Sequence, residues 1–335
     1  MKKIAKILAM FAVFALAFSF AGCKSDDSDS SDDDVTISGG STSGNGSSNS
    51  SSSGSNSSGG GNSGSSEQIP EGFVKIPAVS LKGTEYYAPG SVLLIIDRKI
   101  EIASFYISDH PVTRGEYKAV MGSDPSTAKA YDKDGNELEG DDNVKNNPVN
   151  YISWYDALVY CNTRSIKENL TPCYTIDGKT DPSKWVTVPA SSNDIWNAAI
   201  CDFDADGYRL PTEVEWEWAV RGKNSYYYAG SDDINEVAWY TENTNDTGTR
   251  DVKTKKANGY GLYDMSGNVY EWCWDWYGSI SSGTVASGPA SGSGRCLRGG
   301  SWNLSANYAQ VFFRGGYNPS DRNNRYGFRV VRTAK

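Results

Sequence analysis

Three segments of the chain combine a helix-capping pattern with apolar residues at helical spacing. A Ser or Thr oxygen that accepts from first-turn amides, followed three positions later by an acid, is typical of a helix start. The pattern occurs at Thr113 with Glu116, at Ser153 with Asp156, and at Thr212 with Glu215. Behind each start, apolar residues recur on one face, which predicts three half-buried helices. The expected buried residues are Tyr117, Val120 and Met121; Trp154, Ala157, Leu158 and Cys161; and Trp216, Ala219 and Val220.

Short apolar runs bounded by turn residues predict strands in the rest of the chain. The candidates are residues 73–76, 92–96, 100–107, 186–188 and 328–332. The sequence contains 10 Trp, 21 Tyr and 35 Gly, a composition that favours irregular structure held together by aromatic packing over a helical bundle. We therefore expect residues 69–335 to form one large, loop-rich α+β domain.

The N-terminus has the layout of a secretory signal. Lysines precede an apolar run at residues 7–20, and small residues lie just before Cys23. The run is shorter than a membrane-spanning helix requires. A cysteine at this point resembles the bacterial lipoprotein signal, although a plain signal peptide with an incidental cysteine is the alternative. We expect residues 1–22 to be a lipoprotein signal peptide and Cys23 to carry the lipid.

Residues 23–68 are mostly Ser, Gly, Asn and Asp, and contain too few apolar residues to offset the entropy of ordering. We expect this stretch to be a disordered tether. Together with the signal at the N-terminus, it predicts an exported protein that touches the membrane only through the lipid on Cys23. The location is then the bacterial outer surface or the periplasmic face. The net charge of −9 makes nucleic acid a poor partner, because phosphates require clusters of Lys and Arg.

Two motifs rich in glycine and aromatic residues frame a polar segment near the C-terminus. They are Arg298-Gly299-Gly300-Ser301-Trp302 and Gly327-Phe328-Arg329-Val330-Val331. Between them, Tyr, Phe, Ser, Gly and Asn predominate, which is typical of antibody combining sites because Tyr adds contact area at low entropic cost. The segment has no Cys or His and one acid, Asp321, so we expect it to bind rather than to catalyse.

Five blocks in this order resemble the formylglycine-generating-enzyme family, also called the sulfatase-modifying-factor domain. They are Phe105-Tyr106-Ile107-Ser108 before Pro111-Val112-Thr113; Asn147-Pro148-Val149 with residues 150–157; Gly207-Tyr208-Arg209-Leu210-Pro211-Thr212-Glu213 with residues 214–217; Gly259-Tyr260-Gly261-Leu262 with residues 263–272; and the two C-terminal motifs. The resemblance implies a variant C-type lectin fold with the ligand face near the C-terminus.

The chemistry of the family's enzymes is missing from the matching positions. The resemblance implies a catalytic cysteine pair after Gly-Gly-Ser, and here those positions hold Leu304 and Ala309, which cannot supply a thiolate or bind copper. Relatives with a histidine-ligated iron need several imidazoles, whereas this chain has only His110, interpreted as an ordinary surface residue. We therefore expect a protein that is not an enzyme and requires no cofactor.

A non-catalytic branch of the family fits better: the variable proteins of diversity-generating retroelements, which randomise a C-terminal stretch at adenine-bearing codons. This resemblance implies a variable, ligand-binding segment at about residues 303–326 of a surface-displayed monomer, whose ligand is an unidentified protein or glycan. The predicted contacts are Leu304, Ser305, Asn307, Tyr308, Phe313, Gly315, Gly316, Tyr317, Asp321, Asn323 and Arg325. The alternatives are an enzyme of the parent family with relocated chemistry and a calcium-dependent lectin.

Calcium is the one metal that the sequence suggests, as a structural ion. The resemblance implies ligands at Asp264, Gly267, Val269 and Glu271, whose oxygens suit a hard cation. Residues 202–213 also match the spacing of an EF-hand loop, although they lack its entering helix.

Beyond Cys23 the chain has an odd number of cysteines, so at least one is expected to stay unpaired within the chain, and Cys161 is the best candidate for a buried free thiol.

Overall fold

The computed structural model describes residues 68–83, 91–93, 95 and 97–334. The chain divides into two units, Met1–Gly64 and Ser65–Lys335, and everything described below belongs to the second. The predicted signal peptide, the lipidated Cys23 and nearly all of the predicted tether lie outside the described residues and stay predictions.

All three predicted helices are confirmed. They are α1 (Arg114–Met121), α3 (Trp154–Lys167) and α5 (Glu213–Arg221), and each begins at the expected Thr or Ser with a complete capping box. The shorter elements are α2 (Asp141–Val144), α4 (Asp194–Asn197), α6 (Ile234–Val237), α7 (Thr241–Thr244), and the 3₁₀ turns η1 (Pro182–Lys184) and η2 (Ala306–Ala309). Within the described part of the chain, no helix is long and apolar enough to cross a membrane.

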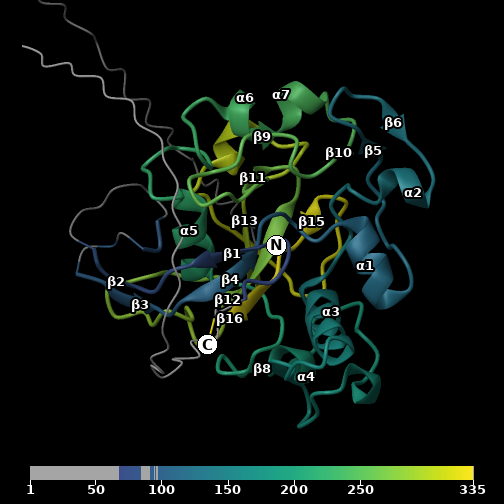
Figure 1. Ribbon diagram of the computed structural model, residues 1–335. Coiled ribbons are helices and arrows are strands. Elements are labelled where there is room, and N and C mark those ends of the chain that lie inside the picture. The colour runs from purple at the N-terminus through teal and green to yellow at the C-terminus, as the bar shows by residue number, and fades with distance from the viewer. Residues whose placement is uncertain (1–67, 84–90, 94, 96, 335) are drawn as a thin grey trace, which may run out of the picture. The chain divides into compact units, whose positions relative to one another are not determined.

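Two small sheets form the centre of the domain (Figure 1). One is antiparallel, in the order β1 (Phe73–Ile76), β4 (Phe105–Ser108), β16 (Val331–Thr333). The other has the order β14 (Gly315–Tyr317), β13 (Arg295–Arg298), β12 (Tyr270–Trp276), β15 (Tyr326–Gly327), with β12 and β15 parallel. The first sheet joins both ends of the described chain, and the second contains the middle of the predicted ligand segment in β14 and its C-terminal end in β15.

The remaining strands pair in short ribbons that lie around these sheets. They are β2 (Val79–Lys82) with β3 (Lys99–Ile102); β5 (Ala130–Tyr131) with β6 (Glu137–Leu138) and β10 (Thr249–Arg250); β7 (Tyr174–Thr175) with β8 (Ile200–Cys201); and β9 (Ala238–Trp239) with β11 (Ser266–Gly267). Loops connect most of these elements, as the sequence predicts.

The strand predictions are only partly correct. Residues 73–76 form β1, but the run at 100–107 is split into β3 and β4, and only the end of 328–332 belongs to β16. The predictions at 92–96 and 186–188 are wrong, because the described residues of these ranges lie in loops. At the first range, Val92 donates its amide to the Glu217 carboxylate at 2.9 Å and so makes no ladder bond there.

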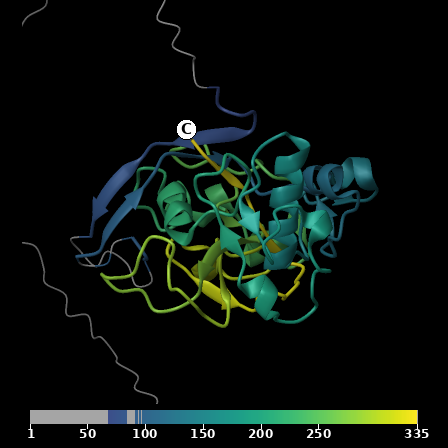
Figure 2. The same ribbon diagram turned by 90° about the horizontal axis from the view of Figure 1, so that it is seen from below.

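Two aromatic cores hold the layers together. In one, Trp154 and Leu158 of α3 pack with Trp272 of β12, and in the other, Trp216 of α5 packs with Ile107 of β4. The buried indoles of Trp154 and Trp272 keep hydrogen-bond partners, as is usual when such groups leave water: Trp154 donates to the Cys273 carbonyl at 3.0 Å. Seen from below, much of the yellow C-terminal part of the chain lies on the side of the domain opposite β1, but the C-terminus itself returns beside β1, where β16 pairs with β4 (Figure 2).

Candidate functional site

The backbone of the segment 303–326 is bonded to the scaffold at several points between Leu304 and Arg325. Strand β14 pairs antiparallel with β13, and Val311 donates its amide to the Tyr227 carbonyl at 2.9 Å. Amide and indole N–H groups of the scaffold donate, at 2.8–3.2 Å, to the carbonyls of Leu304, Pro319, Asn323, Asn324 and Arg325. Because these contacts are made by the main chain, they leave side chains of the segment free to reach solvent, and five of its residues are exposed.

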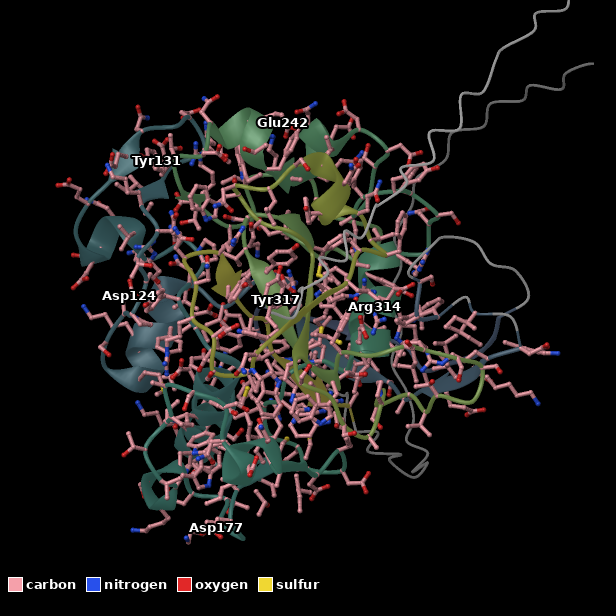
Figure 3. The ribbon with its side chains drawn as sticks, turned by 180° about the vertical axis from the view of Figure 1, so that it is seen from behind. Asp124, Tyr131, Asp177, Glu242, Arg314 and Tyr317 are labelled. Carbon is pink, nitrogen blue, oxygen red and sulfur yellow. The ribbon has the colours of Figure 1, made fainter. Side chains whose placement is uncertain are left out.

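Ten of the eleven predicted ligand residues are at least partly accessible. The exposed ones are Ser305, Asn307, Tyr308, Gly316 and Asp321, and the half-buried ones are Leu304, Phe313, Tyr317, Asn323 and Arg325. Gly315 is buried in β14, where a Cβ would lie 2.8 Å from the Tyr317 ring. We refer to these ten accessible residues together as the strip, and one of them, Tyr317, lies near the middle of the face seen in Figure 3.

Aromatic contacts organise the strip. The rings of Tyr308 and Phe313 meet edge to face with centroids 4.8 Å apart, and Tyr317 lies 5.2 Å from Tyr326. Beneath them, Tyr270 of β12 is buried, and burial raises the pKa of its phenol. Phe313 packs against the first core as well, so the ring supports the strip while part of it stays accessible.

Two arginines within the segment anchor it, and neither was singled out by the sequence pattern. Arg314 binds Glu213 at 2.6 and 2.7 Å, and Arg322 binds Asp156 at 2.7 and 2.8 Å. Both acids lie in the first turns of helices, where a negative charge is favourable and the carboxylate is already oriented. Paired, bidentate arginines of this kind fix geometry and leave little free charge for a ligand.

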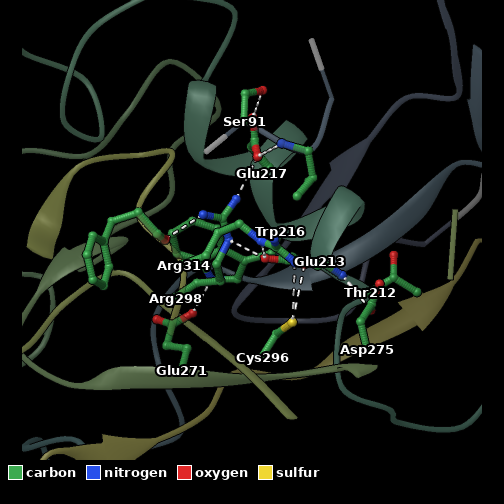
Figure 4. A network of polar contacts seen from close by, with 12 residues as sticks. Ser91, Thr212, Glu213, Trp216, Glu217, Glu271, Asp275, Cys296, Arg298 and Arg314 are labelled. Carbon is green, nitrogen blue, oxygen red and sulfur yellow. Dashed lines mark hydrogen bonds and ion pairs between the residues drawn. The ribbon is translucent and has the colours of Figure 1, made fainter. Parts of the chain in front are cut away.

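Arg298 of the first Gly-Gly motif joins this anchor to the core (Figure 4). Its guanidinium donates to Glu217 at 2.6 Å and to the Phe313 carbonyl at 2.5 Å, and its Nε lies 3.4 Å from Glu213. Arg298 and both glutamates are almost fully buried, and Arg221 also binds Glu217 at 2.7 Å. Both carboxylates are bound by arginines inside the protein, so the network positions the segment and does not present a free acid.

The cysteines of the described residues are poorly suited to form a thiolate. All five described cysteines are free, and Cys161 is fully buried, as predicted. Cys296 donates to Glu213 at 3.2 Å, and burial raises the pKa of its thiol well above the ordinary value. Burial, with the neighbouring charge of Glu213, also raises the pKa of Asp275 to about 8. Since the thiolate is the nucleophilic form, the buried thiols are poor candidates for covalent chemistry.

The predicted calcium ligands are not arranged as an open site. Both oxygens of Glu271 accept from Arg329 at 2.7 Å, and one also accepts from Trp216. Asp264 accepts from the Lys253 amide and from Asn268. Among the described residues, no three His, Cys, Asp or Glu side chains come together in a group that could hold a metal. Calcium binding stays a prediction, and an ion bound by Glu271 would have to displace Arg329.

The EF-hand interpretation does not fit the geometry. Its last ligand, Glu213, is turned inward to Arg314 at the start of α5. Asp202 and Asp206 accept instead from the backbone amides of Asp204 and Thr171, both at 2.9 Å. These acids therefore close a polar turn that leads into the capped helix.

His110 is largely buried, and its interpretation as an ordinary surface residue is wrong. Its Nδ1 pairs with Asp109, and its Nε2 lies 3.4 Å from Glu116. Burial opposes the positive charge, but the bonds to Asp109 and Glu116 outweigh it and raise the pKa of His110 to about 9. The charged imidazole therefore belongs to a structural ion-pair cluster at the start of α1.

We expect His110→Gln to destabilise the protein by on the order of 1–3 kcal/mol near pH 6. Because the folded pKa lies above the unfolded value of about 6.5, the contribution is complete below pH 6.5 and is lost as pH rises through about 9. Urea unfolding of both proteins at pH 6 and pH 9.5 should show the difference shrinking. An equal deficit at both pH values would rule out a charged His110.

The fold and the segment place this chain in a known class. The family model "Sulfatase-modifying factor enzyme 1-like domain" matches residues 24–334, so the chain belongs to this family. The resemblance read from the five sequence blocks is thereby confirmed, and so is the mixed α/β fold of the formylglycine-generating-enzyme type.

Three individual proteins show how similar this chain is to members of the family. The solved structure of Treponema denticola variable protein 1 is 37% identical, with a TM-score of 0.68 over 78% of this chain and 94% of that chain. The chaperone protein LppX of Paenibacillus barcinonensis is 36% identical over 71% of this chain and 83% of its own length. The formylglycine-generating enzyme of Streptomyces coelicolor is 36% identical over 42% of this chain, which spans about half of that enzyme.

Proposed function

We propose that this protein is a non-enzymatic binding module that presents the segment 303–326 to a ligand outside the cell. The observation that carries the proposal is a main chain bonded to the scaffold at several points between Leu304 and Arg325, with ten of the eleven predicted contact residues at least partly accessible. Such an arrangement lets side chains be exchanged at the surface with little effect on stability. The similarity to a variable protein supports diversification of this segment.

The rest of the proposal follows from the sequence and the relatives. The signal-like N-terminus and Cys23 support export and anchoring by lipid, with residues 23–68 as a tether. Leu304 and Ala309 at the positions of the family's cysteines support the absence of catalysis, as does the burial of the free thiols. A relative named as a chaperone favours a protein as the ligand over a small molecule.

A library experiment tests the proposal. In the full chain displayed on bacterial cells, Ser305, Asn307, Tyr308, Tyr317 and Asp321 are randomised, and the library is panned against hen egg-white lysozyme. We expect folded binders with dissociation constants of roughly 1 μM or tighter, because exchanges on a fixed main chain change recognition without unfolding the scaffold.

A second library controls for chance binding. It randomises five residues in and around the turn between β5 and β6, namely Lys133, Asp134, Asn136, Glu137 and Glu139. This library should yield no comparable binders. If it performs as well as the first, or if most members of the first are unfolded, the segment 303–326 is not a special ligand face.

A further inference from the structure

Exposed tyrosines are concentrated around the segment 303–326. Among the described residues, the large apolar side chains with high exposure include five tyrosines, each between 38% and 58% accessible: Tyr151, Tyr226, Tyr227, Tyr277 and Tyr308. Only Tyr308 belongs to the segment, but three of the others touch it from distant parts of the sequence. Exposed aromatic residues that gather on one surface mark interaction sites, whereas scattered ones need no explanation.

Two of the three tyrosines are held by backbone bonds at different points along the segment. Tyr151 donates its amide to the Asn323 carbonyl at 2.9 Å. The Tyr227 carbonyl accepts from the Val311 amide, and the ring centroid of Tyr227 lies 6.4 Å from that of Phe312. These bonds keep the two tyrosines beside the segment at its end and its middle, while their side chains remain open to solvent.

Tyr277 is the most closely packed of the three. A Cβ added at Gly316 would overlap Cγ of the Tyr277 ring, so the ring lies directly against the exposed glycine of β14. The Arg314 guanidinium lies 4.9 Å from the centre of the same ring, a cation–π arrangement. An exchange at Gly316 would therefore move an aromatic ring that belongs to the scaffold.

The shape and charge of this surface limit its partners. Two of the three arginines of the segment, Arg314 and Arg322, are already paired with Glu213 and Asp156, so these two offer little attraction to a polyanion. Four cavities of about 340, 430, 470 and 460 Å³ in the described part of the chain are lined by residues outside 303–326. Small ligands favour concave pockets, whereas accessible tyrosines spread over a broad strip suit a protein surface.

We infer that the ligand face extends beyond the segment 303–326 onto Tyr151, Tyr227 and Tyr277, and that it fits the surface of a folded protein. The three tyrosines supply constant aromatic contacts around the exchangeable side chains. The inference rests on the proposed function of the segment, which it deepens by naming the partner class and three further contact residues.

The lysozyme binders test this inference in the full chain. Tyr151→Ala, Tyr227→Ala and Tyr277→Ala are introduced singly into several binders, and affinity is measured by titration on cells and by calorimetry with purified protein. For most binders, we expect at least one of the three substitutions to weaken binding by tenfold or more, because buried aromatic contacts dominate protein interfaces. The matched phenylalanine substitution should restore most of the affinity.

Control variants distinguish a loss of binding from a loss of folding, and failure of this inference from failure of the proposed function. Ile195→Ala and Ile200→Ala remove comparably exposed side chains near the lower edge where Asp177 lies (Figure 3), and should change affinity less than twofold. Thermal unfolding should show that the tyrosine variants stay folded. If binders are obtained but all three tyrosine variants keep full affinity, the inference is overturned and the proposed function stands.

Two further outcomes would show that the proposed function, or the class of partner, is wrong. If panning yields no binders at all, the proposed function itself fails. If the native chain binds sugars on an immobilised glycan array with a dissociation constant below roughly 10 μM, and Tyr277→Ala abolishes this, the partner class is a glycan and the inference is overturned.

Discussion

Arg298→Met is expected to lower the free energy of unfolding by roughly 3–5 kcal/mol, because it leaves buried carboxylates without their central partner. Arg298 is fully buried, and it connects Glu217 at 2.6 Å with the Phe313 carbonyl at 2.5 Å. Burial disfavours the charge of Glu217, and Arg298 is the first of the contacts that lower its pKa. Urea unfolding of the purified variant at pH 7 measures the loss.

The pH dependence of this loss identifies its cause. Without Arg298 the pKa of Glu217 should rise. The loss of unfolding free energy is therefore expected to be smallest at pH values below this raised pKa, and to grow as the Glu217 carboxylate ionises. The control is Lys256→Met, which breaks an exposed ion pair of 2.9 Å with Glu236 and should change the free energy of unfolding far less, because solvent screens this pair. An Arg298→Met variant as stable as this control would show that the network does not hold the segment.

Features determined by nearby residues could be predicted from the sequence. A capping box requires two side chains three positions apart, so Thr113, Ser153 and Thr212 were sufficient to locate the three main helices. The accessibility of the strip could also be predicted locally, because a segment rich in Tyr, Ser, Gly and Asn is typical of an exposed binding surface. The family resemblance added the fold, which short local patterns cannot supply.

Features determined by distant partners could not be predicted. Arg314 and Arg322 lie in the segment, but their acidic partners are 101 and 166 positions away, and nothing local distinguishes these arginines from ligand contacts. The strand prediction at residues 92–96 failed for the same reason, since Val92 donates to Glu217, 125 positions away.

His110 was misassigned for a different reason. Its two acidic partners, Asp109 and Glu116, are near it in the sequence, but a pattern of residue types does not show how deeply a loop is buried. The carboxylate of Glu116 accepts from the Thr113 amide in the capping box and also lies 3.4 Å from the imidazole. The capping box was therefore recognisable from the sequence, whereas the second contact of the same carboxylate depends on the path of the loop.

Gly300→Ala is expected to cost roughly 2–4 kcal/mol and to weaken the binding of lysozyme-selected variants, because Gly300 lets two main chains approach closely. Gly300 has φ of 75°, and a Cβ there would lie 2.9 Å from backbone atoms of Tyr308 and Ala309. The added methyl group must therefore push the turn η2 and the exposed Tyr308 away from the scaffold. Thermal unfolding and affinity titration measure the two effects.

Gly122→Ala is the matched control for this substitution. Gly122 follows α1 with φ of 85°, but a Cβ added there would have no neighbouring heavy atom within 4 Å. It should cost only about 1 kcal/mol, the strain of a left-handed alanine, and leave affinity unchanged. The difference in stability between the two variants measures the effect of the close main-chain contact at Gly300. Equal losses of stability and equal affinities would mean that the Gly-Gly motif does not position the ligand face.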